Sequence, residues 1–134
     1  MKLDEKALLA GSIMMFLAIA IGAFGSHALH EVLIKNGRID VFATASNYHF
    51  YPALALLLLG SIFQNSELQF RNKQLIVWLM LVGTVVFSGS LYLLAIFNIS
   101  WLGAITPIGG IMLLLCWWFM IKGLIVKFLY KTID

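Results

Sequence analysis

The sequence contains one long stretch, residues 74–121, in which no charged residue occurs. A helix needs about 20 apolar residues to cross the hydrocarbon core of a bilayer, so this stretch is too long for a single crossing. The only polar break near its middle is Asn98-Ile99-Ser100. We therefore predict two apolar helices that fold back at this point, and the short connection makes them antiparallel neighbours.

Two further stretches, residues 7–24 and 41–64, are also free of charged residues. Of the 134 residues, 62% are hydrophobic and 11% are charged, whereas a soluble domain carries roughly 25% charged residues. Because no apolar stretch alternates with period two, the strands of a membrane barrel are disfavoured. We expect an all-α fold, a single-domain integral membrane four-helix bundle with spans at residues 7–26, 43–63, 75–97 and 101–121.

The net charge of +3 is explained by where the basic residues lie. If the chain crosses the membrane four times, seven of the nine Lys and Arg residues lie on the side of the membrane that holds the two termini, and two lie on the opposite side. The seven are Lys2, Lys6, Arg71, Lys73, Lys122, Lys127 and Lys131, and the two are Lys35 and Arg38. Since cytoplasmic loops carry an excess of basic residues, we predict a bacterial inner (plasma) membrane protein with both termini in the cytoplasm. No nucleic-acid partner is needed to account for the charge.

The connection between the first two spans is long enough to hold a short helix. Within residues 28–35, Leu29, Val32 and Leu33 recur at helical spacing, which favours a helix lying at the membrane interface. Asn36-Gly37 is a turn signal that ends it, and Asp40 suits the N-cap of the next helix.

Small residues indicate where the predicted spans approach one another. Without a hydrophobic drive between helices in lipid, faces of small residues allow the close packing that holds a bundle together. Three spans carry such faces, which are Ala18, Gly22 and Ser26 in the first span, Thr84, Ser88 and Ala95 in the third, and Gly103, Thr106 and Gly110 in the fourth. Gly25 is placed where the first span bends or ends.

Two prolines fall inside predicted spans. Pro52 removes the helical hydrogen bond to the carbonyl of Tyr48, and Pro107 removes the one to Gly103. Each freed carbonyl is then satisfied by a neighbour, a hydroxyl or water. We expect a kink at each proline, and a kink opens room between helices.

Polar side chains of all four predicted spans reach the outer half of the bilayer. Because a polar group in hydrocarbon is costly unless satisfied, these side chains are expected to face each other across the bundle. They are Ser26, His27, Tyr48, His49, Ser88, Ser90, Tyr92 and Thr106. Two interpretations stay open, a hydrogen-bond network that fixes helix register and a small outward-facing ligand pocket.

The sequence offers little support for metal binding or catalysis. His27, His30 and His49 fall near one another, but no carboxylate or cysteine accompanies them in the pattern of a closed zinc site. No nucleophile and base occur in a catalytic arrangement, and no phosphate-binding loop is present. We expect a protein without metal, cofactor or enzymatic activity.

Four motifs in order resemble the YgdD/YwdK-like family of small four-span bacterial membrane proteins of unknown function. They are GAFGSH at residues 22–27, Tyr48 followed by the run at residues 53–56, GTVVFSGSLY at residues 83–92 and ITPIGG at residues 105–110. The resemblance covers nearly the whole chain and implies a helical bundle with cytoplasmic termini and no established activity. In the family a histidine follows the tyrosine by four residues, where this chain has Pro52 and carries His49 instead.

Two functional hypotheses follow from these observations. The first is a non-enzymatic role in membrane integrity or in a partner complex, built on the outer-half polar cluster. The alternative is a transporter or carrier of a small amphipathic or lipid-like ligand bound in that cluster. The expected partners are the lipid bilayer and either a lipid-like ligand or a membrane protein, and the small-residue faces also suit a homo-oligomer.

Overall fold

The computed structural model describes residues 1–64 and 72–131, and every element in these ranges is helical, so the predicted all-α fold is confirmed. The helices are α1 (Leu3–Ser26), α2 (His30–Asn36), α3 (Ile39–Gln64), α4 (Lys73–Phe97), the 3-10 helix η1 (Ser100–Ala104) and α5 (Thr106–Lys131). The short helix predicted within residues 28–35 corresponds to α2. Arg71 lies outside the described residues.

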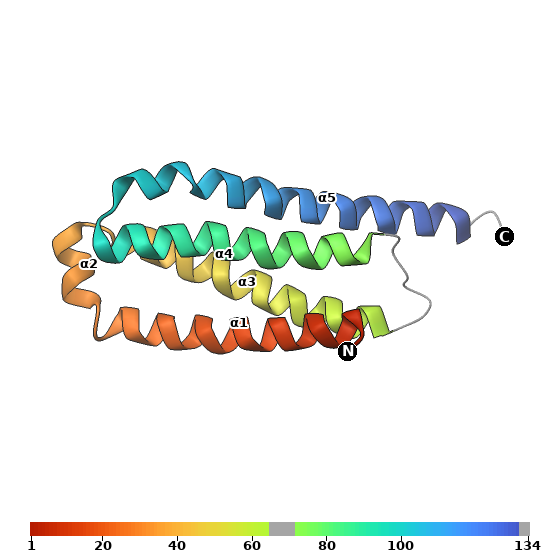
Figure 1. The fold of residues 1–134 in the computed structure, drawn as a ribbon, viewed down its shortest axis with the longest axis horizontal. Coiled ribbons are helices and arrows are strands. Elements are labelled where there is room, and N and C mark those ends of the chain that lie inside the picture. The colour runs from red at the N-terminus through yellow and green to blue at the C-terminus, as the bar shows by residue number, and fades with distance from the viewer. Residues whose placement is uncertain (65–71, 132–134) are drawn as a thin grey trace.

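The four long helices lie side by side and alternate in direction (Figure 1). The N- and C-termini lie at one end of the molecule, the terminal end, and α2 lies at the opposite end, the α2 end (Figure 1). Among the described residues α3 packs between α1 and α4, and α5 packs on α4 and η1, while its backbone makes no close approach to that of α3 or α1. The helices therefore pack in the order α1, α3, α4, α5, as an open row.

Three segments of the described chain are long and apolar enough to cross a membrane. They are α1, α4 and the segment Ser100–Leu129. The remaining long helix, α3, has the length but carries Asn47, Tyr48 and His49 in its first half. Length and composition thus support three spans directly, and α3 is the helix whose polar side chains need partners inside the protein.

An apolar core fills the terminal end. Its largest fully buried side chains come from three helices: Leu56 and Leu59 of α3, Ile76 and Met80 of α4, and Cys116 of α5. A smaller cluster at the α2 end joins Leu33, Phe42, Ala45, Tyr92 and Ala95. The apolar core closes the terminal end, whereas the α2 end combines apolar and polar packing.

Glycines set the distance between neighbouring helices. A Cβ on Gly11 of α1 would lie 2.9 Å from the backbone nitrogen of Leu57 in α3. A Cβ on Gly109 of α5 would lie 2.8 Å from the carbonyl oxygen of Gly83 and would also overlap the backbone nitrogen of Phe87 in α4. Both pairs of helices therefore depend on glycine at the point of contact.

The turns at the α2 end are joined by hydrogen bonds. The Asn36 amide donates to the carbonyl oxygens of Ala95 and Ile96, each at 3.0 Å, and so satisfies acceptors at the end of α4. Asn98 ends α4 in the left-handed conformation, with φ of 54°. The Arg38 guanidinium donates to the Asn98 side chain at 3.3 Å. The polar break predicted at Asn98 is thus a cap tied to the α2–α3 turn.

The structure corrects the prediction of a kink at Pro107. Residues 100–104 form η1, and α5 begins at Thr106, so Pro107 lies in the first turn of α5. A first-turn residue has no helical hydrogen bond to lose, so Pro107 starts the helix and does not kink it. Gly103 and Gly110 lie in different helices and do not form one small-residue face. Pro52 does lie inside α3, as predicted.

Candidate functional site

The polar residues of α4 point to two different neighbours. Thr84, Ser88 and Tyr92 recur every four residues and share the face of α4 that is turned toward α1 and α3. Ser90 lies on another face and meets Thr106 of α5. The single cluster expected from the sequence is therefore divided by α4 into two groups.

His49 and Tyr92 form the centre of the first group. The Tyr92 hydroxyl lies 3.4 Å from Nδ1 of His49, and the two rings meet edge to face with centroids 5.9 Å apart. Both side chains are buried. The Ser46 side chain also hydrogen-bonds to Tyr92, and the Phe42 ring packs against it at 5.1 Å. These contacts hold the Tyr92 side chain of α4 against α3.

Ser90 and Thr106 form the second group. Their hydroxyl oxygens lie 2.8 Å apart. Ser90 also lies 2.9 Å from the carbonyl oxygen of Phe87, and Thr106 lies 3.3 Å from that of Leu102. Every hydroxyl in this group has a partner, so it acts as a link between α4 and α5 and leaves no group free to bind a ligand.

A cavity of about 190 Å³, here called the inner cavity, lies between α1, α3 and α4. Its walls are formed by Met14, Leu17, Ile21, His49, Thr84, Val85, Ser88, Gly89 and Tyr92. Thr84 donates to the carbonyl oxygen of Met80 at 2.7 Å. The Ser88 hydroxyl has no hydrogen-bond partner among the described residues, although the side chain is only 2% exposed. An enclosed, unpaired hydroxyl is unusual in a native protein and needs an explanation.

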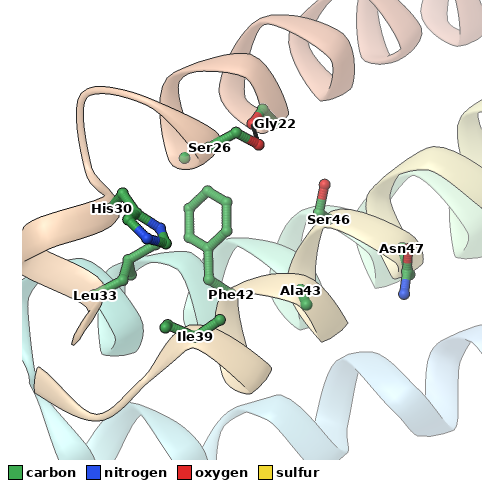
Figure 2. A pocket seen from close by; sticks show the side chains of 10 residues that line it. Gly22, Ser26, His30, Leu33, Ile39, Phe42, Ala43, Ser46 and Asn47 are labelled. Carbon is green, nitrogen blue, oxygen red and sulfur yellow. Dashed lines mark hydrogen bonds between the residues drawn. The ribbon is translucent and has the colours of Figure 1, made fainter.

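A second space, here called the α2-end hollow, measures about 300 Å³ and lies where α1, α2 and α3 meet (Figure 2). Figure 2 shows the Phe42 ring standing between Ser26 and His30, and the Ser46 hydroxyl pointing toward α1. A Cβ on Gly25 would overlap the Phe42 ring, which explains the glycine in the GAFGSH motif. Ser46 lines this hollow and bonds to Tyr92, which lines the inner cavity. Tyr92 and Ser46 thus lie between the two spaces.

An apolar groove of about 460 Å³ lies between α3 and α5, whose backbones make no close approach to each other among the described residues. It is lined by Tyr48, Tyr51, Pro52, Phe87, Gly110, Leu113, Leu114 and Trp117. Tyr48 is 46% exposed here and stacks on Phe87 with ring centroids 4.7 Å apart. Tyr48 therefore belongs to this groove and does not join His49 and Tyr92.

The remaining predicted residues lie at the end of α1. His27 is exposed and takes no part in either polar group. Ser26 is also exposed, and its hydroxyl donates back to the carbonyl of Gly22 at 3.0 Å, so it is not a packing residue. Ala18 is buried as expected. Within the described residues no three His, Cys, Asp or Glu side chains are grouped in a way that would hold a metal ion.

Sequence reasoning missed Ser46 and Phe42, and it assigned Thr84 to helix packing without placing it in the polar cluster. Ser46 lies three residues before His49 and Thr84 lies four before Ser88, so each shares a helix face with a residue predicted for that cluster. Phe42 carried no such signal, since an apolar residue at the start of a span gives no sign of the glycine it will contact.

Comparison with known proteins agrees with the membrane fold. Residues 21–110 match the family described as "Protein of unknown function (DUF423)". The chain belongs to this family. The UPF0382 membrane protein YwdK of Bacillus subtilis (strain 168) is 41% identical over 122 residues, which cover 91% of this chain and 97% of YwdK. A UPF0382 membrane protein of Staphylococcus saprophyticus is 36% identical over 116 residues, covering 87% of this chain and 93% of that protein.

The matched segment of the DUF423 family holds most of the residues described above. It begins in α1 before Gly22 and ends in α5 at Gly110, so both polar groups fall within it. The relatives are named as membrane proteins, and their names give no activity. No solved structure matches the chain.

Proposed function

We propose that the chain crosses a bacterial inner membrane four times, with the α2 end outside and both termini in the cytoplasm. The excess of basic residues at the terminal end supports this orientation. Helix α3 has 26 residues, a length of about 39 Å that exceeds the roughly 30 Å hydrocarbon core. Its polar residues Ser46 and His49 bond to Tyr92 inside the bundle, which lowers the cost of placing α3 in lipid.

The orientation is tested with a reporter that is active only in the cytoplasm. Fused after Asp134, the reporter is expected to be active. Inserted at Gly37, in the turn after α2, it is expected to be inactive, whereas a reporter active only outside should show the opposite pattern. A periplasmic or extracellular signal from the Asp134 fusion would contradict the four-span model.

The function that the geometry supports best is non-enzymatic binding of a small amphipathic or lipid-like ligand in the α2-end half of the bundle. The observation that carries this proposal is the enclosed hydroxyl of Ser88, a residue that lines a cavity, because no other residue in the described ranges bonds to it. Burying an unpaired polar group costs free energy, so its presence favours a ligand that supplies the missing hydrogen bond. The packed core at the terminal end leaves this site closed on the cytoplasmic side.

A structural role is the second candidate and has its own observation. The pairs His49–Tyr92 and Ser90–Thr106 each join two helices within the bundle. In membrane proteins such bonds contribute about 0.6 kcal/mol each on average and fix helix register. On this alternative, the polar residues stabilise a membrane protein that acts through a partner.

Native mass spectrometry from mild detergent separates the two candidates. We expect the wild-type chain to retain an added mass, and the Gly89→Leu variant to lose it, because Gly89 lines the inner cavity and a Cβ there meets nothing within 4 Å. Ser61→Ala is the matched control, since Ser61 is exposed and bonds only within α3. If wild type and Gly89→Leu give the same spectrum with no added mass, the ligand-binding proposal is contradicted and the structural role is favoured.

A further inference from the structure

We propose that the inner cavity receives an uncharged amphiphile, whose hydroxyl or ester group hydrogen-bonds to Ser88 and whose tail passes between α1 and α4 into the bilayer. This inference rests on the proposed ligand-binding function and specifies its ligand. Three properties of the cavity carry it: the unpaired hydroxyl, the absence of charge in its walls and the apolar rim.

Ser88 lines the cavity, and its enclosed hydroxyl has no hydrogen-bond partner among the described residues. A serine in a helix commonly turns its hydroxyl to a carbonyl one turn earlier, as Thr84 does to Met80 in the same helix. The Ser88 hydroxyl makes no such bond. Nδ1 of His49 is already bonded to the Tyr92 hydroxyl, and Tyr92 is also bonded to Ser46. A ligand atom that pairs with Ser88 therefore satisfies the group that the fold leaves unsatisfied.

The walls of the cavity select against a charged ligand. None of the residues that line it is Lys, Arg, Asp or Glu. An isolated charge buried without a partner is far more costly than a neutral polar group. The matching head group is therefore neutral and able to accept or donate one hydrogen bond, as an alcohol or an ester does.

The size and rim of the cavity define the rest of the ligand. A volume of about 190 Å³ is comparable to the roughly 150 Å³ of an engineered apolar cavity that binds benzene, so a group of a few carbon atoms fills it. Leu17 and Val85 line the cavity and are 43% and 61% exposed. These two residues form an apolar opening on the outside of the bundle, where a longer alkyl tail meets lipid.

Photolabelling tests the inference directly. The probe is a 1-octanol that carries a diazirine on its chain, and the comparison probe is the octanoate with the same diazirine. The protein is labelled in mild detergent and the adducts are mapped by peptide mass spectrometry. We expect the alcohol to label the α1 and α4 residues of the inner cavity at least five times more than the octanoate, and excess unlabelled 1-octanol to suppress the adducts.

Variants separate the hydrogen bond from the space. Ser88→Ala is expected to lower cavity labelling by the alcohol at least fivefold while the protein stays folded, and Gly89→Leu is expected to abolish it. Ser61→Ala, on the exposed side of α3, is expected to label as wild type does. A thermal unfolding curve for each variant shows whether a loss of labelling reflects a loss of fold.

Two results would overturn the inference. Equal labelling by alcohol and octanoate with no effect of Ser88→Ala would show that the cavity does not select a neutral hydrogen-bonding group. No cavity adduct in wild type would show that only water meets Ser88. In both cases native mass spectrometry still tests the proposed ligand-binding function separately. An added mass on the wild-type protein would show that it binds an amphiphile of another kind.

Discussion

Ser88 carries an enclosed hydroxyl that no described residue pairs. An unpaired buried hydroxyl costs about 1–3 kcal/mol, so removing it from the ligand-free protein should not destabilise the fold. Sequence reasoning placed Ser88 and Ser90 in one cluster, yet they have opposite roles: Ser90 bonds to Thr106, and Ser88 bonds to no described residue. The two serines are therefore a matched pair for experiment.

We predict that Ser88→Ala raises the stability of delipidated protein by about 1 kcal/mol, because it removes the unsatisfied hydroxyl. Ser90→Ala is predicted to lower it by about 1 kcal/mol, because the Thr106 hydroxyl loses its partner in α4. Thermal unfolding in mild detergent measures both. A loss of stability in Ser88→Ala as large as that in Ser90→Ala would mean that Ser88 has a structural partner.

At the scale of helices, the sequence defined the elements better than it defined their contacts. The hydrophobic stretches and the break at Asn98 located the long helices because length and polarity decide where a membrane helix begins and ends. The sequence did not show that the last apolar segment begins with a 3-10 helix, because an apolar stretch does not distinguish a 3-10 turn from an α-helix, and η1 precedes Thr106. Pro107 follows at once, a position typical of a helix start.

The sequence also did not identify which glycine of the last helix packs against α4. Regular spacing pointed to Gly110, whereas Gly109 makes the close approach to α4. Spacing on one helix gives the faces that small residues share, but it does not give the face that a neighbour covers. The sequence also did not show that some polar residues of α4 face α3 and others face α5. The depth of each residue in the membrane could be inferred from the sequence, but its direction around the helix axis could not.

Gly109 and Gly110 give a sharp test of the contact between α4 and α5. We predict that Gly109→Ala lowers stability by roughly 1–3 kcal/mol through overpacking, because its Cβ would overlap the backbone nitrogen of Phe87. Gly110→Ala is expected to have little effect, since its Cβ would lie 3.5 Å from the Phe87 ring, an ordinary contact. Thermal unfolding of the two variants checks this, and equal effects would contradict the described packing.

The whole molecule divides along its length into two halves with different packing. The core at the terminal end is formed by aliphatic and aromatic side chains from all four long helices. The α2-end half contains the hydrogen-bonded pairs, the hollow and the unpaired Ser88. This arrangement would let the proposed binding site coexist with a stable bundle, because the closed core holds the helices while the other half keeps space between them.

The reactivity of Cys116 measures how readily the terminal-end core opens. This residue is the only cysteine of the chain, it is fully buried in the terminal-end core, and its Sγ lies 3.3 Å from the carbonyl oxygen of Ile76. Because a thiol must reach solvent to react, we predict that a maleimide labels Cys116 only as fast as the bundle opens. Gly109→Ala should accelerate labelling severalfold, whereas Gly89→Leu, which fills the cavity nearer the α2 end, should leave the rate unchanged. Rapid labelling of the folded wild-type protein would show that α4 and α5 separate readily and that the terminal half is not the rigid part of the molecule.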